Sequence, residues 1–473
     1  MKQYKTWKQR REDAQRKCLR ALCGSAALRD FRSFWGTTIL LIVVASISRA
    51  QTPLNFDEAL RLVRQNNLQL QKQQQKQKIA ELEVAIKRGQ RLPALDLSAT
   101  ASYTDEVARL DIPLDRIGLP LPPNVEPPRI ELGGHDRTDI AVGVRQPIFT
   151  GAKLSTQVEL AQTAVESERT RLAVLNQQTS YQVYLIFYQA QIFKKERKIH
   201  EASLARLNVQ LQQIRNLFSA AQVMAYDTLQ VYNQTLQLKI QMDQNQRDQR
   251  LLDLQMSRLL NLSEGRPIAE MDMTKPLEFR ASLDSLKQKA FQARPELNGV
   301  RLGQRSAQLT RKLAKSNYLP DLGAEAKYHY GKPGLNQAAN QWMDYGTVGV
   351  SLQWNLWRGN QDRHRVEAAE AEYNRLTLEE RELLRNIDYE VERSWENAKF
   401  AVKQIELAER LLVQQQERYR IVSTQQGEGV ATTNDLIVAE TDLTQAELQL
   451  QRALIQYYLS QSEILLATGM IAE

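Results

Sequence analysis

Four segments of the chain alternate between apolar and polar residues with a period of two, namely 95–103, 138–149, 322–330 and 346–356. This alternation predicts β-strands that have one apolar and one polar face. A length of about 10 residues suits a tilted transmembrane strand. A soluble sheet with one solvated face alternates in the same way, so the strands alone leave both interpretations open.

Aromatic residues gather near the ends of these segments, as the aromatic girdles of membrane strands do. They are Tyr103, Phe149, Tyr328, Tyr330, Tyr345, Trp354 and Trp357.

Two long stretches, 152–217 and 360–424, contain no proline and no glycine, and their apolar residues recur every three or four positions. Each predicts a helix of nearly 100 Å, at about 1.5 Å per residue. The apolar stripe is narrow, so these helices must pack as coiled-coil pairs, each with a further helix after a short turn. The stripes comprise Val183, Ile186, Phe187 and Ala190, and then Ile387, Val391, Trp395, Ala398, Val402 and Ile405. Shorter helices are predicted for 55–91 and 282–318.

The chain repeats itself. Leu92-Pro93 recurs as Leu319-Pro320 at an offset of 227, Gly151 recurs as Gly359 at an offset of 208, and Val223 to Leu229 recurs as Val430 to Leu436 at an offset of 207. The change of offset places a proline-rich insert, Ile112 to Gly134, in the first copy, where a surface loop is expected. We therefore predict two repeats, 51–280 and 281–473. Each has a helix, strand-loop-strand and helical hairpin, with strand-to-helix junctions at Pro93, Gly151, Pro320 and Gly359.

Four strands per chain are too few to close a barrel, because closure needs at least about eight. If the strands span a membrane, several chains must contribute to one barrel and cover each other's strand edges. The predicted fold class is mainly α with a small β part.

The net charge of +8 lies in the first 50 residues, which hold 11 Lys and Arg against three acidic residues. The remainder carries 63 − 11 = 52 basic and 55 − 3 = 52 acidic residues, so nothing indicates nucleic-acid binding. The apolar run Thr37 to Ile47 and the small-x-small pattern ending at Ala50 predict a signal peptide, residues 1–50. A single membrane anchor is the alternative, although the run is short for one. Both cysteines, Cys18 and Cys23, precede the run.

Neither a catalytic constellation nor a cofactor motif is evident. The histidines are scattered, without metal-ligand spacing, at His135, His200, His329 and His364. We therefore expect no enzyme, no cofactor and no metal.

The chain resembles the TolC-like outer-membrane efflux proteins over about 53–470. Each motif alone is weak, but their duplicated order is specific. The motifs are Asp57-Glu58-Ala59-Leu60, Asn66-Asn67-Leu68-Gln69-Leu70, Leu92-Pro93, Gln146-Pro147-Ile148-Phe149-Thr150-Gly151-Ala152, Asn355-Leu356-Trp357-Arg358-Gly359, and Gly429-Val430-Ala431-Thr432-Thr433-Asn434-Asp435-Leu436 followed by Ala439-Glu440.

The resemblance implies a homotrimer in the outer membrane of a Gram-negative bacterium, extending into the periplasm. Four transmembrane strands from each chain would form a 12-stranded β-barrel, and the helical hairpins would form an α-barrel. The protein would be a passive conduit in a tripartite efflux or type I secretion system. Its partners would be a periplasmic adaptor (membrane fusion) protein, an inner-membrane transporter of RND, ABC or MFS type, and outer-membrane lipid. The competing interpretation is a secreted structural or adhesive coiled-coil protein.

The resemblance also implies that the hairpin turns 218–227 and 424–435 form the periplasmic entrance. The gate candidates are Tyr419, Arg420, Asn434, Asp435 and Asp227. Asp227, Asn434 and Asp435 would also suit plain helix caps. The candidates for adaptor contact are Gly427, Gly429, Val430, Ala431, Ala221 and Val223. The first turn lacks the glycines of the second.

The small number of His and Met residues argues mildly against a dedicated copper or silver exporter.

Overall fold

The computed structural model describes residues 52–111, 129–132, 134–263, 265–273, 282–336 and 340–471, which fall almost entirely within one compact unit, Leu54–Glu473. The predicted signal peptide lies outside the described residues. The fold is mainly α with a small antiparallel sheet, as predicted.

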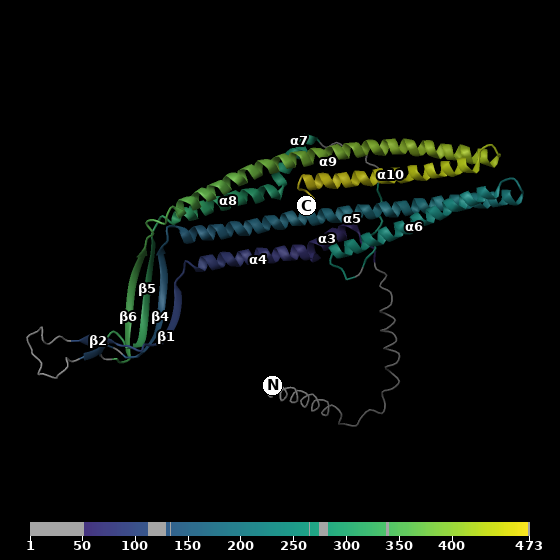
Figure 1. Cartoon of the computed structure of the whole chain (residues 1–473). Helices are drawn as coiled ribbons and strands as arrows, with labels where there is room; N and C mark the ends of the chain where they lie inside the picture. Colours follow the sequence, from purple (N-terminus) through teal and green to yellow (C-terminus); the bar gives the residue numbers. More distant parts are fainter. Residues whose placement is uncertain are drawn as a thin grey trace, which may run out of the picture. The chain divides into compact units, whose positions relative to one another are not determined.

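The described elements follow one order twice along the chain, with two additional short strands in the first series (Figure 1). The first series comprises α3 (Phe56–Asn66), α4 (Leu68–Gly89), β1 (Ala94–Tyr103), β2 (Ala108–Asp111), β3 (Arg129–Leu132), β4 (Asp136–Phe149), α5 (Lys153–Ser219) and α6 (Ala225–Leu259). The second comprises α7 (Leu283–Ala293), α8 (Pro295–Ser316), β5 (Asp321–Lys332), β6 (Met343–Gln353), α9 (Gln361–Gly427) and α10 (Thr433–Ala467).

The two helical hairpins, α5–α6 (the first hairpin) and α9–α10 (the second hairpin), have equal arms. Helices α5 and α9 each have 67 residues, and α6 and α10 each have 35. The starts of both arms are separated by the same offset, 361 − 153 = 208 for the long helices and 433 − 225 = 208 for the short ones. The offset of 207 inferred for the turns is therefore wrong by one. The boundary predicted between repeats, 280/281, falls outside the described residues and stays a prediction.

The single helix predicted over 55–91 is wrong, because the chain breaks at Asn67. Its backbone is extended there (φ −62°, ψ 123°), and its Oδ1 accepts hydrogen bonds from the backbone N–H groups of Gln69 and Leu70 at 2.9 and 3.2 Å. This is an N-cap for α4. The Asn67 amide also donates to the Leu259 carbonyl oxygen at the end of α6, 2.9 Å away. The break therefore joins α4 to the first hairpin.

The helix predicted over 282–318 is likewise two helices, which meet at Arg294. A residue before proline is driven out of the helical region, and Arg294 has φ −71° and ψ 119°. Pro295 then occupies the first position of α8, where its missing N–H costs nothing.

The main sheet has the order β1-β4-β5-β6, and every neighbouring pair is antiparallel. The predicted strand 346–356 is displaced, since β6 runs from Met343 to Gln353 and Trp354 lies beyond it. The predicted insert loop, 112–134, contains strand β3, which pairs with β2 to make a two-stranded arm. The six insert prolines lie outside the described residues.

Helix α5 occupies the centre of the helical layer. It contacts α4 and α6 on one side and α8 and α10 on the other, and α9 packs against α8 and α10. The apolar stripes make these contacts, since Val183, Phe187, Ile387 and Val391 are all buried. The layer therefore runs from α4 and α6, through α5, then α8 and α10, to α9. Figure 1 shows the sheet beyond one end of α5 and α9 and the hairpin turns at the other.

No helix in the described ranges is both long enough and apolar enough for a membrane span.

Candidate functional site

The strand-to-helix junctions use paired residues of positive φ. Gly151 and Ala152 (φ 56° and 65°) precede α5, and Gly359 and Asn360 (φ 59° and 64°) precede α9. This left-handed conformation is the reason that a glycine recurs at an offset of 208. Pro93 and Pro320, two further predicted junction residues, lie where the chain leaves α4 and α8 to enter β1 and β5.

Gly151 and Gly359 form a matched test of these junctions. A Cβ on Gly151 would lie only 2.7 Å from the Cβ of Leu319, whereas a Cβ on Gly359 meets nothing within 4 Å. We expect Gly359→Ala to cost about 1 kcal/mol of stability, from backbone strain alone. Gly151→Ala should cost at least about 2 kcal/mol, because overpacking is added. Thermal unfolding of the purified variants measures both, and equal losses would contradict the contact.

The two hairpin turns have the same backbone. Ala221 (φ 56°) in the first takes the left-handed place of Gly429 (φ 76°) in the second. In both turns the next amide, of Gln222 or Val430, donates to a carbonyl five residues earlier at 2.9 Å. The absence of glycine from the first turn thus leaves its shape unchanged.

The turns differ in what they expose. The first presents the apolar side chains of Met224 and Tyr226 to solvent, and the second presents Val430. Val223 packs instead against the buried cluster around Ile214. The other residues predicted for adaptor contact, Gly427, Gly429, Ala431 and Ala221, lie in or beside the turns.

Two of the predicted gate residues, Asp435 and Asp227, cap helices within one chain. Asp435 Oδ2 accepts hydrogen bonds from the backbone N–H (3.0 Å) and hydroxyl (2.6 Å) of Thr432, which lower the pKa of the Asp435 carboxyl. Asp227 accepts from the backbone N–H of Met224 at 3.1 Å. A gate role for either stays a proposal.

The predicted Tyr419, Arg420 and Asn434 form no latch with Asp435 among the hydrogen bonds of the described residues. Arg420 pairs with Glu417 on its own helix at 2.7 Å, Tyr419 is half-buried, and Asn434 is exposed. Arg418 was not predicted from the sequence; it pairs with Asp442 across the second hairpin and also helps to lower the pKa of Asp435.

A partly buried ionic cluster, which was not predicted from the sequence, joins α5 to α10. We call it the inter-hairpin seam; it comprises Ser203, Arg206, Glu440, Thr444 and Glu447. Glu440 is only 1% exposed, and its Oε1 accepts from the Ser203 hydroxyl at 2.6 Å and the Arg206 guanidinium at 3.2 Å. The two hairpins are therefore held together by charge as well as by apolar packing.

A second buried polar cluster lies farther from the turns. The Glu196 carboxylate accepts hydrogen bonds from Arg452 of α10 at 2.6 and 2.8 Å and from Asn245 of α6 at 3.2 Å. His200 is buried one turn along α5, and burial lowers its pKa, against an opposing effect of Glu196. Three helices thus meet at one carboxylate.

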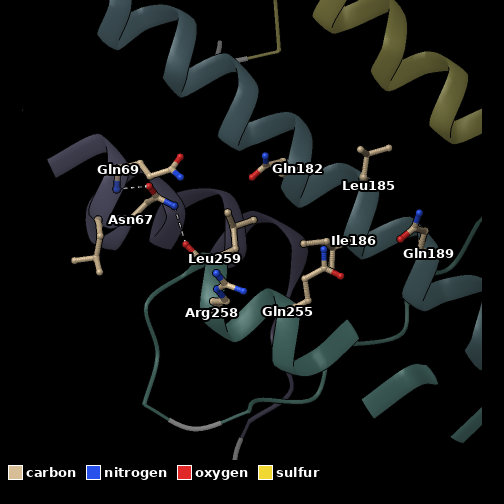
Figure 2. Close-up of a pocket in the computed structure, with 10 residues that line it drawn as sticks. Asn67, Gln69, Gln182, Leu185, Ile186, Gln189, Gln255, Arg258 and Leu259 are labelled. Atoms are coloured by element: carbon tan, nitrogen blue, oxygen red, sulfur yellow. Dashed lines mark hydrogen bonds between the residues drawn. The ribbon is translucent and has the colours of Figure 1, made fainter. Parts of the chain in front are cut away.

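A cavity of about 450 Å³ lies beside Asn67, where α4, α5 and α6 meet (Figure 2). Its walls are mostly amide and aliphatic side chains with one arginine: Asn67, Leu68, Gln69, Gln182, Leu185, Ile186, Gln189, Gln255, Arg258 and Leu259. Among the described residues, no group of three His, Cys, Asp or Glu side chains gathers as metal ligands.

The sheet separates apolar from polar side chains as the alternation predicts. Leu97, Val142 and Tyr328 are adjacent in register and exposed on one face. On the other face, His329 lies 3.1 Å from an Asp139 carboxylate oxygen and stacks on Tyr345. An exposed apolar face of this extent on a paired sheet needs a covering partner or an apolar medium.

This fold, with long helical hairpins carrying a four-stranded sheet at one end, is that of outer membrane channels. The crystal structure of the Vibrio cholerae outer membrane protein VceC matches with a TM-score of 0.72 and 15% identity, covering 88% of this chain and 96% of that one. The Campylobacter jejuni channel CmeC matches with a TM-score of 0.72 and 12% identity, covering 88% and 85%. The open state of the Neisseria gonorrhoeae channel MtrE gives 0.65 and 13%, covering 88% and 89%.

Residues 286–470 match the family described as "Outer membrane efflux protein". This match, together with the shared fold, confirms the resemblance to TolC-like efflux proteins. The search of curated proteins gave no match.

Proposed function

We propose that the chain is the outer-membrane channel component of a tripartite efflux or type I secretion system. It would act as a passive homotrimeric conduit, and neither as an enzyme nor as a secreted adhesive rod. The observation that carries this proposal is a pair of matching free edges. Strands β1 and β6 each have a neighbour on one side only within the main sheet.

The helical layer ends at the same two edges as the sheet. Helix α4 leads directly into β1 and packs, like α6, against α5, whereas α9 directly follows β6 and packs against α8 and α10. Both edges carry exposed apolar residues, such as Leu236 and Ile240 on α6 and Leu407 and Leu411 on α9. Two different edges that meet head to tail generate a ring when the rotation closes. Three copies would supply 12 strands, all antiparallel, with the apolar face toward lipid.

The turns would then lie together at the periplasmic end, as the entrance of the conduit. The apolar side chains of Met224, Tyr226 and Val430 support contact there with a periplasmic adaptor protein, which in turn would meet an inner-membrane transporter. A ring of Asp435 carboxylates at this entrance would favour cations.

Neighbouring residues on opposite faces of β1 provide the experiment. Leu97→Arg places a charge on the apolar face, and Ser98→Arg, its matched control, places the same charge on the polar face. An arginine facing lipid costs about 2–4 kcal/mol near the bilayer midplane. We expect Leu97→Arg to be lost from the outer-membrane fraction and Ser98→Arg to assemble, as judged by membrane fractionation and by oligomers on unboiled gels.

A wild-type protein that fractionates as a soluble monomer, or with the inner membrane, would refute the proposed function. Equal tolerance of both arginines would refute the assignment of the apolar face to lipid.

A further inference from the structure

Positions that are buried on α5 are exposed at the equivalent places on α9. Thr170 of α5 is 7% exposed beneath α8, whereas Leu378, its counterpart on α9 at the offset of 208, is 63% exposed. Ser203 is 1% exposed beneath α10, whereas its counterpart Leu411 is 38% exposed. Helices α8 and α10 of the second repeat cover α5, whereas no described repeat covers this face of α9. In a ring, the neighbouring copy supplies the missing repeat.

The junction between the two repeats of one chain is therefore a template for the junction between copies. Within one chain, residues of α5 contact residues of α10. The offset of 208 relates α5 to α9 and α6 to α10. Between copies, α9 of one copy would therefore contact α6 of the next copy, in the way that α5 contacts α10 within one chain. Six successive repeats around a ring would make this relation hold at every junction.

The neighbours of Tyr181 within one chain can be mapped by this template onto the residues that line the cavity beside Asn67. Tyr181 lies on α5 between Gln177, whose amide donates to the Gly469 carbonyl oxygen at 2.7 Å, and Tyr188, whose ring centroid is 5.7 Å from that of Tyr458. These two contacts bring the part of α10 around Glu463 opposite Tyr181. In agreement with this register, burial raises the pKa of the Tyr181 phenol, Glu463 raises it further, and Arg393 of α9 lowers it. Their counterparts in the first repeat, at the same offset, are Gln255 and Leu185, and both line the cavity beside Asn67. The counterpart of Tyr181 itself is Tyr389, also a tyrosine, which is 63% exposed.

We propose that the cavity beside Asn67 is a receptor site for a tyrosine, filled by Tyr389 of the partner subunit. The site is incomplete in one chain and rests on the proposed function, because it requires a ring of copies.

The cavity chemistry fits a phenol. Ile186 and Leu185 supply an apolar wall for the ring, and the amides of Gln182, Gln189 and Gln255 can hydrogen-bond to its hydroxyl (Figure 2). Within its own chain Tyr389 lies on the outward side of α9, where the Arg393 guanidinium carbon is 5.8 Å from its ring centroid.

Two other positions agree with the template independently. The rings of Tyr188 and Tyr458 are in contact within one chain, with centroids 5.7 Å apart. Their counterparts at the offset of 208 are Glu396 and Arg250, respectively. Both are exposed and have no ion-pair partner among the described residues. Opposite charges thus face each other where the template predicts contact. Ser203 and Glu440 are hydrogen-bonded within one chain, and their counterparts are Leu411 and Tyr232, respectively. Both counterparts are exposed apolar residues.

Cysteine cross-linking tests the site in the full-length protein. In a Cys18→Ser/Cys23→Ser background no other cysteine is present. We expect Tyr389→Cys combined with Gln255→Cys to give covalent dimers and trimers with a short bismaleimide in outer membranes. The control, Tyr389→Cys with Leu236→Cys, moves the second cysteine about 28 Å along α6 and should give at least tenfold less cross-linked product.

The result separates this proposal from the proposed function. Intact oligomers on unboiled gels without cross-linking at 389 and 255, or with equal cross-linking in the control, would overturn the receptor site and leave the conduit standing. The absence of any oligomer would overturn both.

Discussion

Arg206→Met is expected to destabilise the protein by about 3–5 kcal/mol, because it leaves the Glu440 carboxylate buried without its cation. Ser203 and Thr444 would still donate hydrogen bonds to Glu440, but they carry no charge. A second substitution, Glu440→Leu, removes the stranded carboxylate. The double variant should therefore regain most of the lost stability, since buried ion pairs are often replaced by apolar residues at little cost.

Urea or thermal unfolding of the purified protein measures this difference, and the two single variants and the double variant complete the cycle. The matched control is Arg410→Met, which breaks an exposed pair with Glu406 and should change stability by less than about 1 kcal/mol. Equal effects of Arg206→Met and Arg410→Met would mean that the inter-hairpin seam does not hold the hairpins together.

Acidification is expected to weaken the packing around His200. Burial holds the pKa of His200 in the folded protein below its ordinary value of 6.5, so the unfolded chain takes up the proton first as the pH falls. Stability is therefore fully present above about pH 6.5 and declines below it, by at most about 1.4 kcal/mol per pH unit from this group. Glu196 on α5 opposes the decline, and Arg452 on α10 adds to it.

His200→Gln should flatten the pH dependence of the melting temperature between pH 7 and 5. An unaltered slope in His200→Gln would show that other groups govern the response to acid.

The order of the elements could be predicted from the sequence because its signals are local. Alternation along β1 and β5, the glycines at 151 and 359, and the proline-free stretches each fix the backbone over a few residues. The break at Arg294 could also have been predicted, since Pro295 disfavours a helical residue before it. The break at Asn67 has a local basis too, because its side chain caps α4, but its contact with the carbonyl oxygen of Leu259 could not be predicted, since that residue is far away along the chain.

The buried charges were equally beyond the sequence. Glu440 lies in a motif used for the family resemblance, yet nothing in its neighbours along the chain distinguishes it from the many solvated carboxylates on these helices. Its burial follows from Arg206 and Ser203 across the contact of α5 with α10. By contrast, Asp435 and Asp227 were predicted at the turns, and within one chain both cap helices there.

Because the two hairpins have arms of equal length, the distance from the sheet to the turn is the same in both. Both long helices span about 100 Å from sheet to turn, at about 1.5 Å per residue. Shortening both arms of one hairpin by two helical turns would draw its turn back by about 10 Å and leave the other turn projecting alone. To shorten the distance from the sheet to both turns, matched deletions are therefore needed in all four arms, α5, α6, α9 and α10. A longer or shorter loop elsewhere cannot compensate for a change in one hairpin.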